Sequence, residues 1–468
     1  MKFFKSSFRK QAVRSYEKES RISGSAEQVY AWHARPGAFQ RLTPDWQGAR
    51  MVESEEIRDG NKAVLEVSLG PFAKRWVARY GSCVPGRRFV DEQEKGPFSR
   101  WTHRHEFLPV NDLESRMLDH VNYAVSFGQD RGLWGNGIRR KIDRLFHFRH
   151  ERLRNDFRRL AAASLQSQRI LITGASGLVG RALSAFLSAA GHEVWDLVRR
   201  PPNLNRREIF WDYLNQRVNR EDLEGFDAVI HLAGEGIAAG RWNPRRKAAI
   251  RRSRVEGTRF LAQTLAGLRR APKTLLCASA IGFYGDRAGE EVSEKSPRGN
   301  GFLPEVCFEW EDAVRAAQTA GIRVAQVRTG IVLNSGGGAL PQMLLPFQMG
   351  LGGVIGKGNQ WMSWISLEDL VGVYYFLLCR EDLSGPFNAT APGAVTNLNF
   401  TKALGQILRR PTRFPLPAFA VNVLLGEMGE RLLLEGQKVK PARLHEEGYE
   451  FFYPELEPAL RFELGRFQ

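Results

Sequence analysis

The side chains best suited to chemistry in this sequence lie between residues 279 and 311. The stretch EVCFEWEDAV, residues 305–314, places Cys307 and Glu311 four residues apart, on one face of an expected helix. A nearby carboxylate raises the pKa of a thiol, so Cys307 is poorly suited to proton transfer at neutral pH. The hydroxyls of Ser279 and Tyr284 lie upstream, and they are the catalytic candidates that remain.

Each of these residues also has a purely structural interpretation. Tyr284 can be a packing residue, Cys307 an inert buried thiol, and Glu311 an exposed helix carboxylate. If the protein turns over a substrate, we expect its proton relay to avoid Cys307 and Glu311. Loss of the hydroxyl of Ser279 or Tyr284 is then expected to cost more.

A glycine-rich turn precedes these residues and predicts a dinucleotide site. TGASGLVG follows the apolar stretch RILI and opens a helical pattern. Glycines at this spacing permit a tight turn, close approach of a pyrophosphate and close packing of helix on strand. The helix N-terminus then faces the phosphate charge. The residues expected to line the site are Thr173, Gly174, Ser176, Gly177, Leu178, Val179 and Gly180.

Two arginines after the next strand favour NADP over NAD. VWDLVRR ends with Arg199 and Arg200, and a guanidinium suits a 2′-phosphate through charge-assisted hydrogen bonds. NAD sites place an acid at the end of this strand. Asp196 is the competing candidate, but it lies two residues before the expected strand end.

Strand and helix patterns alternate after residue 168. Runs of four to six apolar residues without alternation are typical of parallel strands covered on both faces. The pattern predicts an α/β fold with a doubly wound parallel Rossmann sheet. We expect this NADP-binding domain over residues 166–390, with a C-terminal helical segment, residues 391–468, completing the substrate side.

The first third of the chain has a different pattern. Short strands separated by turn residues fill residues 11–127, interrupted by a helical stretch after the N-cap candidate Ser25, and a long amphipathic helix covers 138–160. This order resembles the α+β helix-grip fold of START-like, polyketide-cyclase-type domains. The resemblance implies a domain over residues 1–165 with an apolar cavity for a hydrophobic ligand. The alternative is an interior that is simply full.

Two histidines on one strand raise the question of a metal site. His103 and His105 share a strand face, and His120 lies on the next strand. Imidazoles at this spacing can bind a metal ion. No carboxylate or cysteine stands at ligand spacing beside them in the sequence, so we expect no metal.

Composition bounds the remaining function classes. The net charge is +17, and the basic excess lies mainly in residues 1–165. A basic surface can meet nucleic acid, but helix 138–160 lacks a recognisable reader motif, so we expect no nucleic-acid partner. The four cysteines form no Cys-x-x-Cys pair, which favours a reducing compartment. No apolar run approaches the roughly 20 residues of a membrane span. We expect a cytoplasmic protein whose oligomeric state is open.

Residues 169 to the C-terminus resemble the extended, epimerase-like short-chain dehydrogenase/reductases. They are most similar to an atypical subgroup sometimes named cell-division inhibitors, which has a characteristic C-terminal segment. The segments that carry the resemblance are TGASGLVG, HLAGEGIAAGRWNPRRKAAIRRSRVEGT, SAIGFYGD, FEWEDA, VRTGIVLNSGGGALPQMLLPF and GLGGVIGKGNQWMSWISLEDLV. A START-like domain fused in front resembles a known variant of the subgroup.

The resemblance implies further site residues. Ala233 and Gly234 match the turn beside the adenine, and Thr329, Gly330 and Val332 match the turn beside the nicotinamide. Arg254 stands where relatives usually have asparagine. Ser279 lies near the usual catalytic serine, one residue before the expected place, which Ala280 holds. Cys307 and Glu311 stand for the usual Tyr-x-x-x-Lys pair, so the inherited proton relay is absent.

The loop GLGGVIGKGNQWMSW is the expected substrate rim. It offers Lys357, Gln360, Trp361 and Trp364 to a small-molecule substrate, although glycine mobility alone would also explain it. We therefore expect an NADP(H)-dependent epimerase or reductase that acts on an apolar or aromatic carbonyl compound. The alternative is a catalytically silent scaffold that senses nucleotide or binds lipid.

Overall fold

The protein is described here by a computed structural model, which covers residues 13–69, 72–125, 132–163 and 165–467. The chain divides near residue 162 into an N-terminal unit and a C-terminal unit. Among the helices of these residues, none has the length and apolar character needed to cross a bilayer.

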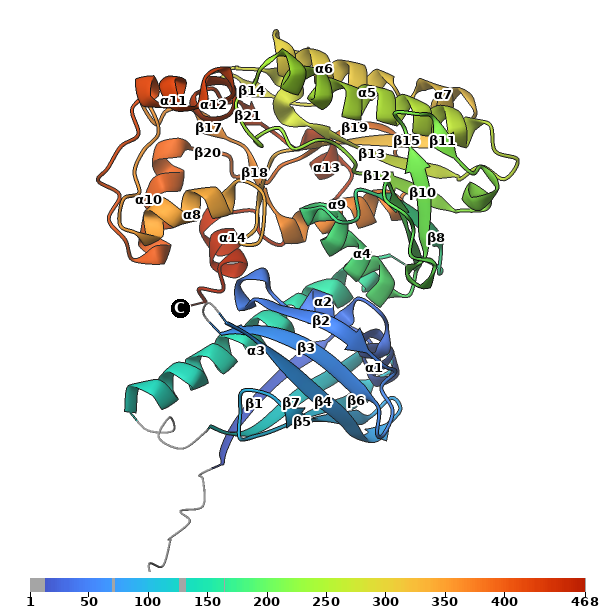
Figure 1. Cartoon of the computed structure of the whole chain (residues 1–468), viewed down its shortest axis with the longest axis vertical. Helices are drawn as coiled ribbons and strands as arrows, with labels where there is room; N and C mark the ends of the chain where they lie inside the picture. Colours follow the sequence, from blue (N-terminus) through green and yellow to red (C-terminus); the bar gives the residue numbers. More distant parts are fainter. Residues whose placement is uncertain (1–12, 70–71, 126–131, 164, 468) are drawn as a thin grey trace, which may run out of the picture. The chain divides into compact units, whose positions relative to one another are not determined.

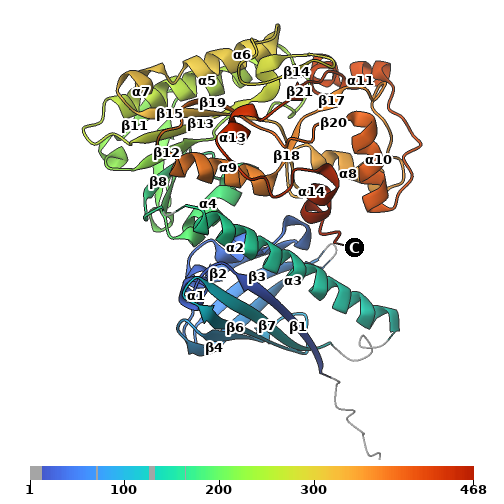
Figure 2. The same ribbon diagram turned by 180° about the vertical axis from the view of Figure 1, so that it is seen from behind.

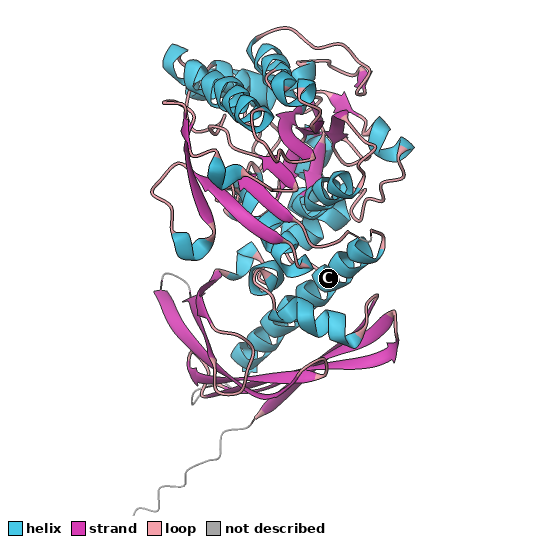
Figure 3. Cartoon of the chain, turned by 90° about the vertical axis from the view of Figure 1, so that its right-hand side faces the viewer, coloured by secondary structure: helices cyan, strands magenta, loops and turns pink. Residues whose placement is uncertain are grey.

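A seven-stranded antiparallel sheet forms the N-terminal unit, in the order β1-β7-β6-β5-β4-β3-β2. Its strands are β1 (Arg14–Ile22), β2 (Ala49–Ser54), β3 (Lys62–Leu69), β4 (Phe72–Val84), β5 (Arg88–Lys95), β6 (Arg100–Asn111) and β7 (Glu114–Ala124). Helices α1 (Ala26–Ala34) and α2 (Ala38–Leu42) connect β1 to β2, and Ser25 caps α1 as expected. The sheet curves around the long helix α3 (Gly132–Ala161), as Figure 3 shows. This is the expected helix-grip fold.

Aromatic side chains fill much of the space between the sheet and α3. Tyr16, Trp101 and Tyr123 from the sheet pack with Ile142 and Phe146 from the helix. A small cavity in this unit has room for about one water molecule, and both ionisable side chains and the apolar Leu42, Met117 and Leu153 line it. A hydrophobic ligand in this unit stays a prediction.

An eight-stranded sheet forms the centre of the C-terminal unit, in the order β11-β10-β9-β8-β12-β13-β15-β19. Its strands are β8 (Arg169–Thr173), β9 (Glu193–Val198), β10 (Glu208–Asp212), β11 (Arg217–Val218), β12 (Ala228–His231), β13 (Thr274–Ala280), β15 (Arg323–Thr329) and β19 (Gly385–Ala389). Every pairing except that of β10 with β11 is parallel. The strand order reverses between β8 and β12, which is where α/β sheets of this class bind ligands.

Helices cover both faces of this sheet (Figures 1 and 2), so the predicted doubly wound fold is correct. One face carries α4 (Leu178–Ala190) and α9 (Leu367–Cys379), and the other carries α5 (Pro244–Ala266), α6 (Phe302–Asp312) and α7 (Arg315–Thr319). A core of Leu171, Trp211, Val229, Leu275 and Trp310 lies under the second group.

The C-terminal residues pair with short strands outside the central sheet. β20 (Val395–Thr396) pairs with β17 (Trp361–Met362), and β21 (Lys438–Val439) pairs with β14 (Glu291–Val292). The remaining elements are β16 (Ile331–Leu333), β18 (Trp364–Ser366), α8 (Leu340–Gln348), α10 (Asn397–Leu408), α11 (Ala418–Leu425), α12 (Glu427–Gly429), α13 (Ala442–Glu446) and α14 (Leu456–Glu463). A boundary at residue 390 stays a prediction.

Candidate nucleotide and active site

The glycine-rich turn has the close backbone contacts that its sequence predicts. Gly174 has a φ of 71°, and a Cβ there would lie 2.9 Å from the backbone nitrogen of Ala233. A Cβ at Gly180 would overlap the carbonyl oxygen of Gly174. Gly177 is the N-cap of α4, and the backbone amides of the first helical turn follow it. Gly174 and Gly180 therefore have no room for a side chain. The N-terminus of α4 lies between them, and a helix N-terminus of this kind can bind an anion.

Thr173 holds the turn to the neighbouring strand. Its Oγ1 accepts hydrogen bonds from the backbone N–H groups of Leu232 and Ala233, each at 3.1 Å, and lies 2.7 Å from His231 Nδ1. Burial lowers the pKa of His231 to about 4, so the ring is neutral and accepts the threonine proton. The Nε2–H of His231 then donates to Thr258 Oγ1 at 2.9 Å. Thr173 therefore positions the site, and its hydroxyl is fully used within the protein.

The two arginines after β9 are equally exposed, at 57% for Arg199 and 58% for Arg200, but they differ in their ion pairs. Arg199 Nη1 lies 3.9 Å from Glu235 Oε1. Arg200 instead forms a two-pronged ion pair with Glu208, with Nη1 at 2.7 Å from Oε2. Burial and the charge of Glu208 raise the pKa of Asp196 to about 6. Both arginines stay predicted phosphate ligands, and Arg200 would have to share its guanidinium with Glu208 to bind one.

Two more arginines contact the loop that follows β12. Arg254 Nη1 donates to the carbonyl oxygen of Glu235 at 2.9 Å, and its guanidinium lies 3.4 Å from where a Cβ would stand on Gly234. Arg246 Nη1 lies 3.7 Å from Glu235 Oε2. Glu235 therefore lies between Arg199 and Arg246. The basic run of residues 245–254 gave no signal that Arg246 would be the one to reach this loop.

A row of polar side chains crosses the last three strands of the sheet at one level. Ser279 of β13 is the partner of Arg328 in β15, and Arg328 is the partner of Asn388 in β19. All three lie near the carboxyl ends of parallel strands, the edge at which sites in such sheets form. Arg328 and Asn388 were not predicted. A charged residue between Val327 and Thr329, within the strand RVAQVRT, was the available signal.

Glu311 and Tyr284 join this row into one hydrogen-bonded network. Ser279 Oγ donates to Glu311 Oε1 at 2.6 Å. Arg328 donates two hydrogen bonds to the same carboxylate, from Nε at 2.8 Å and from Nη2 at 2.7 Å. Its Nη1 donates to the Tyr284 hydroxyl at 2.9 Å, and that hydroxyl donates to Asn388 Oδ1 at 2.7 Å. The site is therefore a serine hydroxyl on a carboxylate whose charge is balanced by a guanidinium.

The network corrects one structural interpretation and agrees with two others. Glu311 is not an exposed helix carboxylate, because its side chain is only 13% exposed and is paired with Arg328. Cys307 is buried, and burial together with Glu311 raises the pKa of its thiol to about 12, as expected for an inert thiol. Tyr284 is fully buried and its hydroxyl has a partner on each side, which fits a positioning role better than proton delivery.

The nicotinamide turn expected after β15 is also tightly packed. Thr329 Oγ1 donates to the carbonyl oxygen of Val327 at 3.2 Å. A Cβ on Gly330 would lie 2.6 Å from the carbonyl oxygen of Ser363, so this position also requires glycine. Val332 follows within β16, which pairs with β18.

The expected substrate rim separates into surface and interior residues. Lys357 is exposed and Trp361 is half-buried. Gln360 Nε2 donates to the carbonyl oxygens of Ile355 at 3.1 Å and Leu433 at 2.7 Å. Its amide therefore connects the loop to the segment around Leu433. Trp364 is wholly buried and its indole donates to the carbonyl oxygen of Gly393 at 2.9 Å. A wholly buried side chain offers no wall to a substrate, so the expectation for Trp364 does not agree with the structure.

Comparison with known proteins decides the family. Residues 170–389 match the NAD dependent epimerase/dehydratase family. An epimerase family protein of Mycobacterium bovis is 41% identical over 297 residues, which cover 64% of this chain and 98% of that protein. This chain belongs to the epimerase family.

Solved structures extend the likeness of this epimerase-family chain. A nucleoside-diphosphate sugar epimerase from Corynebacterium glutamicum superposes with a TM-score of 0.80 at 34% identity, covering 96% of this chain and 90% of that one. Human epimerase family protein SDR39U1, solved with NADPH, gives a TM-score of 0.59 at 37% identity, covering 63% of this chain and 98% of that one.

Both ends of the epimerase-family chain also match known domains. Residues 22–148 match the family of polyketide cyclase, dehydrase and lipid transport proteins, in agreement with the helix-grip fold. Residues 416–463 match a domain of unknown function, DUF1731. The predicted atypical dehydrogenase/reductase with a START-like domain in front is therefore correct.

Proposed function

We propose that the C-terminal unit is an NADP(H)-dependent oxidoreductase or epimerase that acts on a carbonyl group. The observation that carries the proposal is the Ser279–Glu311–Arg328 network at the carboxyl edge of a nucleotide-binding sheet. The closed glycine turn and the exposed Arg199 support NADPH as the cofactor. The NADPH in the human SDR39U1 structure supports the same choice.

The protein's own residues would each have a defined task. The backbone amides at the start of α4 hold the pyrophosphate, and Arg199 pairs with the 2′-phosphate. The bound nicotinamide supplies or accepts hydride. In reduction Ser279 would donate its Oγ proton to the substrate oxygen and recover a proton from solvent, and in oxidation the proton would move the other way. Glu311 accepts a hydrogen bond from this hydroxyl and so orients it. Arg328 holds the Glu311 carboxylate in place through two hydrogen bonds.

Tyr284 has a supporting task in this proposal. Its hydroxyl holds Arg328 from one side while Asn388 holds the hydroxyl from the other. A substrate would enter past Lys357 and Trp361, where a cation and an aromatic face suit an anionic or aromatic group. The carbonyl compounds to test are therefore apolar and aromatic ketones, together with nucleotide sugars of the kind named for the Corynebacterium glutamicum neighbour.

Removing the Ser279 hydroxyl is expected to lower turnover by about 10²–10⁴-fold, the usual contribution of general acid–base catalysis. The measurement is NADPH consumption by the full chain over the carbonyl panel, with NADPH affinity determined in each variant. Cys307→Ala is the matched control, because that thiol is buried and protonated, and it is expected to keep turnover within about tenfold of the unaltered chain. Tight NADPH binding with no consumption by the unaltered chain would instead favour the silent nucleotide-sensing scaffold.

Arg199→Ala is expected to weaken NADPH binding by about 1.5–3 kcal/mol, the usual value of a hydrogen bond to a charged group. NADH binding should hardly change, because NADH lacks the 2′-phosphate. Calorimetric titration of both cofactors checks the difference. Arg315→Ala is a suitable control, because this 74% exposed arginine lies on α7 and pairs with Asp312, outside the predicted cofactor site. Equal losses for the two cofactors in Arg199→Ala would contradict the assignment.

A further inference from the structure

Four ionisable side chains meet on the inner face of the N-terminal sheet. His103 and His105 point to the same side of β6. Asp91 of β5 is the strand partner of His103, and Asp119 of β7 is the strand partner of His105. The sequence-based argument against a metal site rested on the lack of a nearby carboxylate, and that argument is wrong, because the carboxylates come from the two flanking strands.

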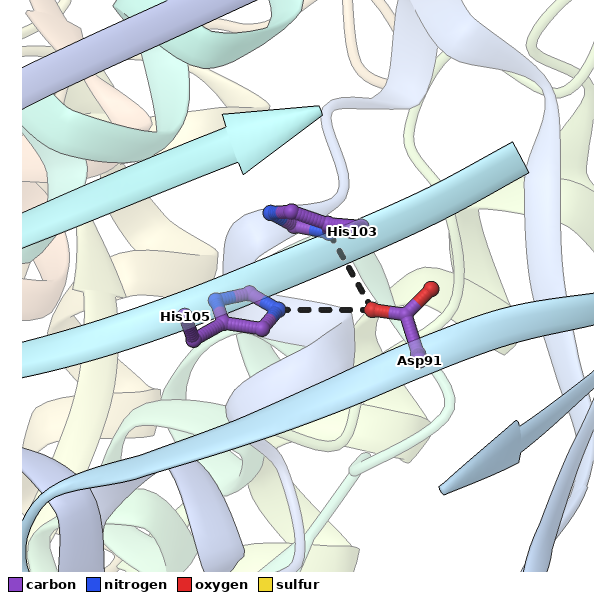
Figure 4. A group of neighbouring side chains, drawn as sticks. All are labelled: Asp91, His103 and His105. Atoms are coloured by element: carbon purple, nitrogen blue, oxygen red, sulfur yellow. Dashed lines mark ion pairs between the residues drawn. The ribbon is translucent and has the colours of Figure 1, made fainter. Parts of the chain in front are cut away.

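Three donor atoms of this group converge on one point (Figure 4). Asp91 Oδ2 lies 3.1 Å from His103 Nδ1 and 3.4 Å from His105 Nε2. Zinc is bound by nitrogen and oxygen at roughly 2.0–2.2 Å, so two ligands of a tetrahedral site stand about 3.3–3.6 Å apart. The two distances to Asp91 are close to this spacing, and the three donor atoms all lie within 4.8 Å of one another.

The opposite nitrogens of both rings face a second carboxylate. Asp119 Oδ1 lies 3.1 Å from His103 Nε2 and 2.7 Å from His105 Nδ1. Its Oδ2 contacts His150 Nε2 of α3 at 2.9 Å. Metal-binding histidines typically donate their other N–H to such a carboxylate, which fixes the tautomer and the ring orientation. Asp119 has the position of this supporting residue for His103, and its Oδ1 lies near His105 Nδ1 without a hydrogen bond.

The charges of this group suit a cation. His103 lies between two carboxylates, with Nδ1 and Nε2 each 3.1 Å from an oxygen of Asp91 and Asp119, so its ring can carry a proton on both nitrogens. A metal ion bound beside Asp91 would replace the proton on Nδ1.

Neighbouring aromatic rings hold the two imidazoles in place. Phe89 stacks on His105 with ring centroids 4.2 Å apart, and Phe146 meets His103 edge-on at 5.1 Å. The one-water cavity is bordered by His105 and Asp119, and Asp91 and His103 do not line it. His33 and His150 also line this cavity, and their buried Nε2 and Nδ1 atoms have no hydrogen-bond partner among the described residues.

We propose that Asp91, His103 and His105 bind one zinc ion in the N-terminal unit, with a water molecule as the fourth ligand. Two histidines, one carboxylate and an open position are the ligand set of a catalytic rather than a structural zinc. The helix-grip interior would then hold a Lewis acid that can polarise a small oxygen-bearing ligand.

The test is metal binding by the full chain after removal of metal with a chelator. We expect one Co²⁺ or Zn²⁺ per chain and the intense visible absorption of tetrahedral Co²⁺. Asp91→Asn keeps the side-chain size and is expected to weaken Zn²⁺ binding by more than 100-fold. Asp119→Asn should weaken it by about 10–100-fold, the usual effect of a supporting carboxylate.

His120→Gln is the matched control. This histidine lies on β7 and pairs with Glu17 at 2.6 Å, outside the proposed ligand set, so its replacement should leave the Zn²⁺ affinity unchanged. Circular dichroism and the unfolding midpoint without metal establish that each variant is folded. A folded, metal-free protein that binds no Zn²⁺ at micromolar concentration would overturn the proposal. Equal Zn²⁺ affinity in the Asp91→Asn and His120→Gln variants would also overturn it.

Discussion

Replacement of Arg328 by methionine is expected to lower the free energy of unfolding by about 3–5 kcal/mol, the usual cost of removing one partner of a buried ion pair. Methionine fills a similar volume but leaves the 13% exposed carboxylate of Glu311 without its counter-charge. The hydroxyl of Tyr284 also loses a donor. Chemical denaturation, followed by tryptophan fluorescence, measures the change.

The neighbouring pair of Arg315 and Asp312 provides a matched control. These side chains are 74% and 45% exposed, so Arg315→Met should cost only about 0–1 kcal/mol. The double variant Arg328→Met with Glu311→Gln should recover part of the loss, because it removes the unpaired charge. Equal losses in Arg328→Met and Arg315→Met would show that the Glu311 pair contributes little to stability.

Gly180→Ala is expected to weaken NADPH binding by tenfold or more and to destabilise the C-terminal unit by about 1–3 kcal/mol, the usual cost of overpacking. The added methyl group would overlap the backbone of Gly174 and Ala175, so α4 must move away from the turn that receives the pyrophosphate. Cofactor titration and thermal unfolding measure the two effects.

A second glycine separates this effect from a general cost of substitution. A Cβ at Gly289 would meet no atom within 4 Å, and its φ is not in the left-handed region. Gly289→Ala should therefore keep both the NADPH affinity and the stability of the unaltered chain. If Gly180→Ala binds NADPH as tightly as Gly289→Ala does, the turn is not the pyrophosphate site.

The features that the sequence predicted well are those encoded within short segments. The glycine turn, the buried parallel strands and the amphipathic helix near residues 138–160 each depend on neighbours in the chain. Their periodicity or spacing is visible without knowing what packs against them. The helix-grip and doubly wound folds follow from the order of these segments.

The residues that were missed come together through pairing between strands. Arg328 and Asn388 join Ser279 because β13, β15 and β19 align at one level. Asp91 and Asp119 join the histidines in the same way, from β5 and β7. Strand register depends on contacts between distant segments, so no local pattern places these side chains together.

Misjudged exposure has a related cause. The helix that contains Glu311 is amphipathic. Its sequence alone did not show that this carboxylate forms an ion pair with Arg328, which lies inside the sheet. Trp364 was assigned to a mobile loop, but it begins the three-residue strand β18, whose residues are all buried. In both cases the partner lies in a distant part of the chain.

The aligned polar row also bears on how the sheet assembles. Successive side chains of a strand face opposite sides, so a slip of one residue in β15 would turn Arg328 toward the face covered by α9. Nearly the whole of α9 is apolar and buried, and an unpaired guanidinium there would be very costly. Neighbouring apolar strands of similar composition can otherwise pair in more than one alignment. The position of Arg328 between Ser279 and Asn388 is therefore expected to favour the native register of the last three strands, because a shifted register would bury an unpaired charge.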